Sequence, residues 1–284
     1  MKIDHVSIAW SDLASLRSAF EEAGLKTDYG GLHSNGKTHM SLLAFDDGSY
    51  IELISVVKPG PSPSWPQFIA DNGGPCAWAI EVHDIAREAE RIRSLGIKTI
   101  GPGDYNRKRP DGVLVEWKLV FIGDKEPGAT LPFLIEDITP RDYRVKPSPS
   151  VSSGGGKRIL TGVEKVVLGV KELEKEVDLF RKVYSWEEPS VSDNLGGEFE
   201  GITLAQFKDT PVVLASPVRK DTWLGKRLDK FGDSPCTFLI GASDMKAAIY
   251  RYHLKNQQKW IGDSNQTVAW LPLLDGVKLG FIGS

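Results

Sequence analysis

The sequence predicts an α+β protein in which one strand–helix–three-strand unit (βαβββ) occurs four times, two units in each of two domains. Three observations lead to this fold class. A strand pattern at 4–9, followed by a helix pattern, recurs at 164–169. Each half of the chain divides again into two such units. A run rich in Pro, Ser and Gly at 146–157 separates the halves.

The first unit shows the pattern most clearly. Strand-type stretches cover 5–10 and 38–45, as expected for strands with one buried face. A helix-type spacing of apolar residues runs over 13–23 between them. Asp47-Gly48, before a further strand over 50–56, is a strong signal for a tight hairpin.

The other three units follow the same order. In the second unit, Asp84 and Gly96 are suited to begin and end one helix. The predicted elements of this unit are strands over 77–82, 113–122 and 131–138 and a helix over 85–95. The third unit has a strand from 164 and a helix over 172–184, and the fourth has a strand over 236–241, a helix over 245–254 and strands over 267–274 and 277–282.

The run at 146–157 predicts the domain boundary. A segment of this composition cannot bury enough apolar area to order itself, so we interpret it as a linker. The expected organisation is a first domain at 1–145 with the candidate site, the linker at 146–157, and a second domain at 158–284.

The composition narrows the function classes. The 284 residues carry a formal net charge of −3, whereas nucleic-acid-binding proteins normally have a large basic excess. No apolar stretch approaches the roughly 18 residues of a membrane span, and no signal peptide is evident. We therefore expect neither nucleic acid nor membrane as a partner. Two distant cysteines, Cys76 and Cys236, predict buried thiols in a cytoplasmic protein rather than a disulfide framework.

Several segments together resemble the glyoxalase-like domain family of the vicinal oxygen chelate superfamily, which also contains bleomycin resistance proteins and extradiol dioxygenases. The segments are Ile3-Asp4-His5-Val6, residues 30–33, 37–39, 47–54 and 107–112, Trp117, and residues 131–135. The resemblance covers about residues 1–140 well and the second half by layout alone. It implies that two units pair into a cupped sheet, with metal ligands on the first and last strands of each unit.

Strand alternation predicts one polar sheet face in the first unit. His5 and Ser7 share a face of the first strand, and Tyr50 and Glu52 share a face of the fourth. If a two-residue turn closes the hairpin, His39 and Ser41 lie on the face of Glu52. The predicted substrate contacts on this face are Ser7, Ser41 and Tyr50, with His39 as a substrate contact or catalytic residue.

The resemblance implies a divalent metal site, with Zn, Ni, Mn or Fe held by His5 and Glu52. In the second unit, Trp78 stands at one ligand position and Glu136 at the other, so the predicted ligand set is His5, Glu52 and Glu136. A metal-free polar pocket built from the same residues, or a simple His–Glu hydrogen bond, remains open.

Further candidates surround this face. Trp78 narrows the pocket or packs in the core. The resemblance implies that Arg107 or Arg109 clamps a carboxylate or enolate, although both flank a turn where solvated charges are common. Trp117 is a predicted substrate contact, and His33 is either a lid residue or a surface histidine.

The second half lacks this chemistry. Lys165 stands in place of His5, Val212 or Val213 in place of Glu52, and Phe238 in place of Trp78, while the position of Glu136 falls near Gly283. We expect a degenerate copy that covers an apolar face of the first domain, as the second subunit of a dimer would. The protein is then a monomer or a homodimer.

The leading hypothesis is an enzyme of isomerase or lyase type that acts on a small organic molecule through an enolate-like intermediate. A metal would polarise the substrate, and Glu52 or Glu136 would move the proton. The alternative is a non-catalytic protein that binds or sequesters a small molecule in a metal-free pocket. No glycine-rich phosphate loop follows a strand and no nucleophile elbow occurs, so no nucleotide cofactor is expected.

Overall fold

The computed structural model describes residues 1–151, 158–193, 196–261 and 266–283. These residues form two eight-stranded sheets, and each sheet joins two of the four units. Within the described ranges, no helix is both long and apolar enough to cross a membrane.

The first sheet has the strand order β2-β3-β4-β1-β5-β8-β7-β6. Its first unit consists of β1 (Ile3–Ala9), α1 (Leu13–Glu22), β2 (Asp28–Leu32), β3 (Thr38–Ala44) and β4 (Tyr50–Val56). After α2 (Pro66–Ala70), the second unit consists of β5 (Gly74–Glu81), α3 (Ile85–Ser94), β6 (Thr99–Lys108), β7 (Leu114–Ile122) and β8 (Phe133–Asp137), and α4 (Arg141–Arg144) follows.

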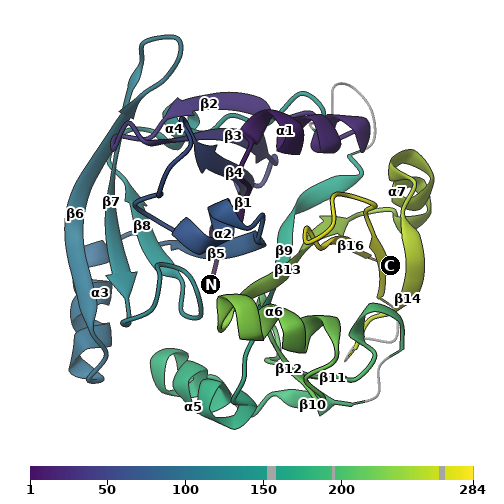
Figure 1. The fold of residues 1–284 in the computed structure, drawn as a ribbon. Coiled ribbons are helices and arrows are strands. Elements are labelled where there is room, and N and C mark those ends of the chain that lie inside the picture. Colours follow the sequence, from purple (N-terminus) through teal and green to yellow (C-terminus); the bar gives the residue numbers. More distant parts are fainter. Residues whose placement is uncertain (152–157, 194–195, 262–265, 284) are drawn as a thin grey trace.

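The second sheet repeats this order as β10-β11-β12-β9-β13-β16-β15-β14. The third unit consists of β9 (Leu160–Gly169), α5 (Leu173–Tyr184), β10 (Ser190–Ser192), β11 (Ile202–Gln206) and β12 (Val212–Pro217). The helix α6 (Trp223–Phe231) follows. The fourth unit consists of β13 (Ser234–Ala242), α7 (Met245–Tyr252), β14 (Lys255–Lys259), β15 (Thr267–Trp270) and β16 (Leu279–Gly283). A 3₁₀ turn covers Gly197–Phe199. Figure 1 shows the two curved sheets meeting in the middle of the molecule near β5, β9 and β13.

The predicted fold class is confirmed, because each unit has the order βαβββ and each pair of units shares one sheet. In both sheets the first strands of the two units pair antiparallel, as β1 does with β5 and β9 does with β13. The sequence analysis gave no range for β11 and β12 of the third unit, nor for β2, β6, β10 and β14, the outermost strands of the two sheets. Outer strands have one unpaired edge and carry the weakest hydrophobic pattern.

One continuous core joins the two domains. Val6 and Trp78 of the first sheet lie in the same buried cluster as Leu168 and Phe238 of the second. Each of these side chains is fully buried. As expected, the second half therefore covers an apolar face of the first.

The first strand of each sheet contains a β-bulge at the same place. On β1, Ile3 pairs with Ile80 and His5 with Ala79, so Asp4 is an extra residue. On β9 the register shifts in the same way at Glu164. A bulge re-aims the side chain that it inserts, and here that side chain is a carboxylate next to the candidate histidine.

The β3–β4 hairpin corrects the predicted register. Its turn is a three-residue loop, because the N–H of Phe45 donates to the carbonyl of Ser49 and Ala44 pairs with Tyr50. Gly48 takes a φ of 89°, the left-handed conformation that such loops require. A one-residue change of register moves every side chain to the other face, so Glu52 pairs with Leu42 and not with a polar residue.

The first part of the predicted linker is ordered against the first domain. Ser148 is buried, accepts a hydrogen bond from the N–H of Ala44 at 3.1 Å, and donates one to Asp28 at 2.7 Å. Val151 is also buried. Residues 146–151 therefore pack on β2 and β3 despite their composition, while 152–157 lie outside the described residues.

Arg227 on α6 joins the two domains. Its guanidinium donates hydrogen bonds to the carbonyls of Gly73 and Pro75 in the first domain and to that of Pro235 in the second. It also lies over the stacked rings of Phe68 and Phe231. A partly buried cation held this way fixes the angle between the domains.

Replacing Arg227 should destabilise the whole chain. The variant R227M leaves buried carbonyls without donors, and we expect it to lower the free energy of unfolding by about 2–4 kcal/mol. Urea denaturation followed by fluorescence measures this. R219M, at a side chain that is 72% exposed, is the matched control and should change stability by less than about 0.5 kcal/mol. Equal midpoints for the two variants would contradict this role.

Candidate functional site

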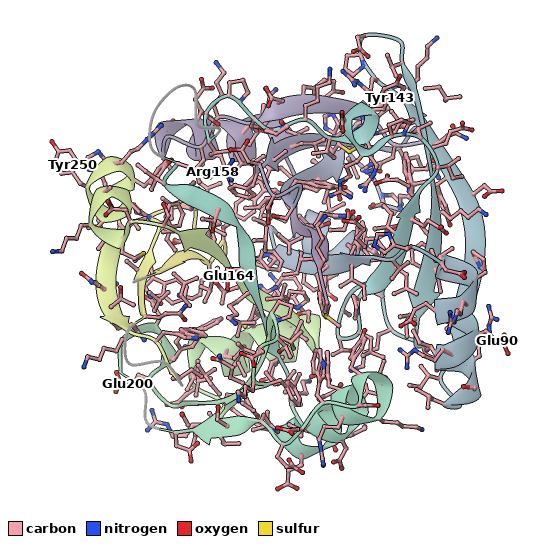
Figure 2. All side chains as sticks on the ribbon, turned by 180° about the vertical axis from the view of Figure 1, so that it is seen from behind. Glu90, Tyr143, Arg158, Glu164, Glu200 and Tyr250 are labelled. Atoms are coloured by element: carbon pink, nitrogen blue, oxygen red, sulfur yellow. The ribbon has the colours of Figure 1, made fainter. Side chains whose placement is uncertain are left out.

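The concave face of the first sheet encloses a cavity of about 210 Å³. It is lined by His5, His33, Ser34, Asn35, Thr38, Met40, Leu42, Tyr50, Glu52, Ile54, Ser64, Trp65, Tyr105, Arg107, Trp117, Leu119, Phe121, Pro127, Phe133, Ile135 and Arg144. Both units of the first domain contribute, so the site exists only because they share one sheet. Figure 2 shows Tyr143 on α4 beyond one end of this sheet, beside the β6–β7 hairpin.

His5 is held rigidly at the cavity. Its Nδ1 lies 2.6 Å from Oδ1 of Asp4, and its ring stacks on Tyr50 with centroids 4.7 Å apart. The edge of Phe133 packs on it from β8 at 5.2 Å. Asp4 therefore fixes the imidazole orientation and leaves Nε2 as the nitrogen available to a ligand.

A buried ion network supports Asp4. Arg141 and Arg144, both on α4, bond to Asp4, and Arg144 also bonds to Asp137 and to the hydroxyl of Tyr50. Burial tends to raise the pKa of Asp4, but the charge of Arg144 and the hydrogen bond with His5 outweigh it and hold that pKa well below its usual value. Asp4 is therefore ionised beside His5 at neutral pH.

Glu52 is a buried carboxylate with two hydrogen-bond partners. His33 Nε2 lies 3.0 Å from its Oε1, and Ser7 donates to its Oε2 at 3.0 Å. Burial tends to raise the pKa of Glu52, but the hydrogen bond and charge of His33, together with His5 and Ser7, bring it to about 2. His33 is fixed in turn by Thr38, 2.8 Å from its Nδ1. His33 therefore lines the cavity, and its role as a lid stays a prediction.

The remaining wall is aromatic and aliphatic. Ring contacts run from Tyr105 to Phe121 at 6.3 Å, from Phe121 to Phe133 at 6.0 Å, and on to His5 and Tyr50. These rings come from β6, β7, β8, β1 and β4, so they cross the sheet as one ladder. Such a wall favours a ligand with a flat apolar body.

Arg107 brings a positive charge to this wall. Its side chain is 5% exposed, and it donates to the carbonyls of Gly30 at 2.6 Å and Arg144 at 2.7 Å. Among the residues that the structure describes, no carboxylate forms an ion pair with it within 4.0 Å. Burial lowers the pKa of Arg107 from its usual value, which reflects the cost of this charge.

His39 and Ser41 do not belong to the site, contrary to the predicted shared face. The three-residue hairpin loop places both on the opposite side of the sheet from Glu52. His39 packs its edge on Tyr29, and Ser41 donates to Thr27 at 2.8 Å. The error lies in the assumed two-residue turn, which shifts the register by one.

Trp78 and Glu136 also point away from the cavity. Trp78 pairs with Val6 and lies in the interdomain core, where its Nε1 donates to the carbonyl of Thr130 at 2.8 Å. Glu136 pairs with Lys118 and accepts from the N–H of Ile85 at 3.3 Å, at the start of α3. Neither therefore reaches a metal at His5 and Glu52.

The other candidates divide between two places. Tyr50, Arg107 and Trp117 line the cavity. Ser7 does not line the cavity, and its hydroxyl donates a hydrogen bond to Glu52. Arg109 lies outside the cavity and is paired with Asp111 at 2.6 Å and with the carbonyl of Tyr143 at 3.0 Å, as in the turn interpretation.

The sequence prediction missed Asp4, Arg144, Phe121 and Phe133. Asp4 directly precedes His5, and in a regular strand its side chain would point to the opposite face of the sheet. The contact between Asp4 and His5 therefore became evident only from the bulge in the structure. Phe121 and Phe133 alternate correctly within their strands and could have been found from that pattern.

The donor set does not fit the metal site that the resemblance implies. On β5 and β8, the cup-facing side chains nearest His5 are Ala77, Ala79, Phe133 and Ile135, and none of these offers a metal ligand. The carboxylates farther along the same face, Glu81 and Asp137, are paired with Lys2 and Arg144. In the described part of the chain, no three His, Cys, Asp or Glu side chains are grouped to hold an ion.

Within the described residues, the concave face of the second sheet does not repeat the His–Glu pair of the first. Lys165 replaces His5 and donates to the carbonyl of Thr210 at 2.8 Å, while Val167 and Val213 pair where the first sheet has Ser7 and Glu52. The face is filled by its own buried side chains: Val167, Phe199, Leu204, Val213, Leu239, Trp260 and Trp270. The expected loss of the His–Glu pair is confirmed.

Two paired βαβββ sheets with a polar cup in one of them define a protein of the vicinal oxygen chelate class. The family described as "Glyoxalase-like domain" matches residues 3–183, and the chain belongs to this family. No curated protein matches the sequence.

Solved structures share the complete fold. A hypothetical protein from Staphylococcus aureus has a TM-score of 0.63 at 14% identity, covering 99% of this chain and 98% of that one. A mutant 4-hydroxymandelate synthase from Streptomyces coelicolor has a TM-score of 0.68 at 11% identity, covering 99% and 92%. At such identities the likeness concerns the fold alone.

The low pKa of Glu52 predicts a pH-dependent contribution to stability. A carboxylate whose pKa falls from 4.5 unfolded to about 2 folded stabilises the fold above about pH 4.5, and the contribution disappears as the pH falls toward 2. Its size is on the order of 3 kcal/mol. The difference in unfolding free energy between wild type and E52Q should therefore shrink between pH 5 and pH 3.

Denaturant titrations at pH 5, 4 and 3 measure this difference. E90Q is the control, because Glu90 is 74% exposed and points away from α3 in Figure 2. A wild-type-to-E52Q difference that stays constant over this range would contradict the assigned ionisation of Glu52.

The small number of possible metal ligands around His5 and Glu52 predicts that the purified protein contains little metal. Protein purified without chelators or affinity metals should contain Zn, Ni, Mn and Fe at well below one equivalent, and H5Q and E52Q should not change this content. Elemental analysis by mass spectrometry measures it. One equivalent of a metal that both variants lose would show that the ligand set assembles differently from the arrangement described above.

Proposed function

We propose that this protein is an enzyme that moves a proton on a small organic molecule bound in the cup of the first domain, without a metal ligand set. The observation that carries the proposal is the Asp4–His5 pair, a buried ionised carboxylate 2.6 Å from an imidazole that lines the cavity. An imidazole oriented in this way is suited to accept and return protons.

The geometry favours His5 over Glu52 as the proton carrier. The pKa of Glu52 is about 2, so this carboxylate holds a proton too weakly to be an effective base at neutral pH. Both of its oxygens are already bonded, to His33 and Ser7. Glu52 therefore positions His33 at the mouth of the cup, which changes the role that the sequence predicted for it.

The proton transfer has two steps. His5 Nε2 takes a proton from a carbon next to a carbonyl or carboxylate, and the electron pair of that C–H bond moves onto the oxygen to give an enolate. The protonated imidazole, stabilised by Asp4, then returns the proton to the same or to a neighbouring atom, which isomerises the substrate. Arg107 supplies positive charge to the developing enolate, and the apolar wall strengthens this interaction.

A second candidate function is binding without turnover. The favouring observation is that most of the wall is apolar and that Glu52 has no free oxygen for chemistry. Such a protein would sequester the same class of molecule in the same cup. The two functions differ in whether His5 exchanges protons with the ligand.

Deuterium exchange distinguishes them. The protein is incubated in D₂O with 2-hydroxy acids, 3-oxo acids and acyl thioesters, and NMR follows loss of the signal of the α-proton. We expect exchange with at least one class, reduced by about 10²–10⁴-fold in H5Q.

H39Q is the matched control, since His39 lies on the other face of the same sheet. It should exchange at the wild-type rate. Exchange that persists in H5Q would contradict the role of His5. Absence of exchange with every class, in protein that still binds ligands, would favour the binding function instead.

A further inference from the structure

We propose that the molecule taken into the cup is a small aryl carboxylate, a single flat ring carrying one anionic group, with the anion on Arg107 and the ring on the aromatic ladder. This substrate class deepens the proposed function and rests on it for the chemistry, but binding itself can be tested separately.

The charge of the cup points to an anion. The ion network around Asp4 is balanced, because Arg141 and Arg144 face Asp4 and Asp137. Both oxygens of Glu52 are already bonded, one to His33 and one to Ser7. Arg107 is different, since its two bonds go to neutral carbonyls of Gly30 and Arg144.

A buried guanidinium with only carbonyl partners keeps unused donors. The group has five N–H bonds, and two of its nitrogens make the bonds described above. Because both anchoring carbonyls belong to the backbone, the guanidinium is held in place before any ligand arrives. A carboxylate that reaches it gains a charge-assisted, geometrically defined pair without a cost of reorganisation.

The ring is inferred from the aromatic side chains of the cup. Tyr105, Phe121 and Phe133 present edge-to-face contacts with interplanar angles of 64–77°. Trp117 on β7 and Trp65 before α2 line the same cavity. A flat ring completes this arrangement through stacked and edge contacts, whereas a flexible aliphatic chain loses them.

The size of the cavity limits the ligand. About 210 Å³ lies below the roughly 300–1,000 Å³ of sites for drug-sized molecules. A single ring with a short acid side chain suits this space. Arg107, Phe121, Phe133 and His5 all line this cavity, and His5 contacts Phe133, so a ligand with its acid on Arg107 and its ring on Phe121 and Phe133 shares the cavity with His5.

Calorimetry with three matched probes tests the proposal. Phenylacetate carries the ring and the acid, phenylacetamide keeps the shape but loses the charge, and cyclohexylacetate keeps the charge but loses the flat ring. We expect phenylacetate to bind at least about 30-fold more tightly than phenylacetamide. Cyclohexylacetate should bind about three- to tenfold more weakly than phenylacetate.

Two arginine variants locate the effect. R107Q should weaken phenylacetate binding by at least about 30-fold and leave phenylacetamide unchanged. R109Q is the control, because Arg109 lies outside the cup and is paired with Asp111. Thermal melting of both variants checks that each is folded.

Equal binding of acid and amide, or tighter binding of phenylphosphonate than of phenylacetate, would overturn the inferred substrate class. The same follows if R109Q loses as much affinity as R107Q. Arg107-dependent binding of phenylacetate together with no deuterium exchange would uphold the ligand class and reject the proton-transfer function, so the two failures are distinguishable.

Discussion

The site depends on one inserted residue in the first strand. The bulge on β1 makes Asp4 an extra residue, so that a carboxylate and the imidazole of His5 contact each other although they are adjacent in sequence. Asp4 is bound in turn by Arg141 and Arg144 of α4. Arg144 also bonds to Tyr50 and Asp137, so the position of Asp4 determines how α4 packs on the site. The second sheet keeps the bulge at Glu164 but has Lys165 beside it, so the geometry survives there without the chemistry.

The fold was predictable because the strands show a clear hydrophobic periodicity and the strand–helix pattern repeats along the chain. Strands of the sheet interior, such as β1 and β4, show clear patterns, and the recurrence of 4–9 at 164–169 indicates two similar halves, each of which divides into two units. The outer strands β2 and β6 were not predicted, since an edge strand such as β6 is half exposed and polar. Arg107 lies on that strand, so its burial became evident only from the paired sheet.

The site was predictable only in part, and the failures have definite physical causes. His5, Glu52 and Tyr50 were correctly grouped, because they follow from alternation within central strands. The prediction for His39 and Ser41 was wrong because the hairpin loop is one residue longer than assumed. The sequence Asp46-Asp47-Gly48 is compatible with either a two-residue or a three-residue loop, so it does not determine the register. Trp78 and Glu136 were placed by analogy with a metal site, whereas the pairing of β5 and β8 turns them to the helix side.

A crystal structure of the protein grown with phenylacetate tests the central claim most directly, with anomalous scattering recorded to detect any metal. The account predicts the carboxylate on Arg107, the ring against Phe121 and Phe133, and the adjacent carbon about 3–3.5 Å from His5 Nε2. A ligand bound outside the cup, or a metal ion held by His5 and Glu52, would contradict it.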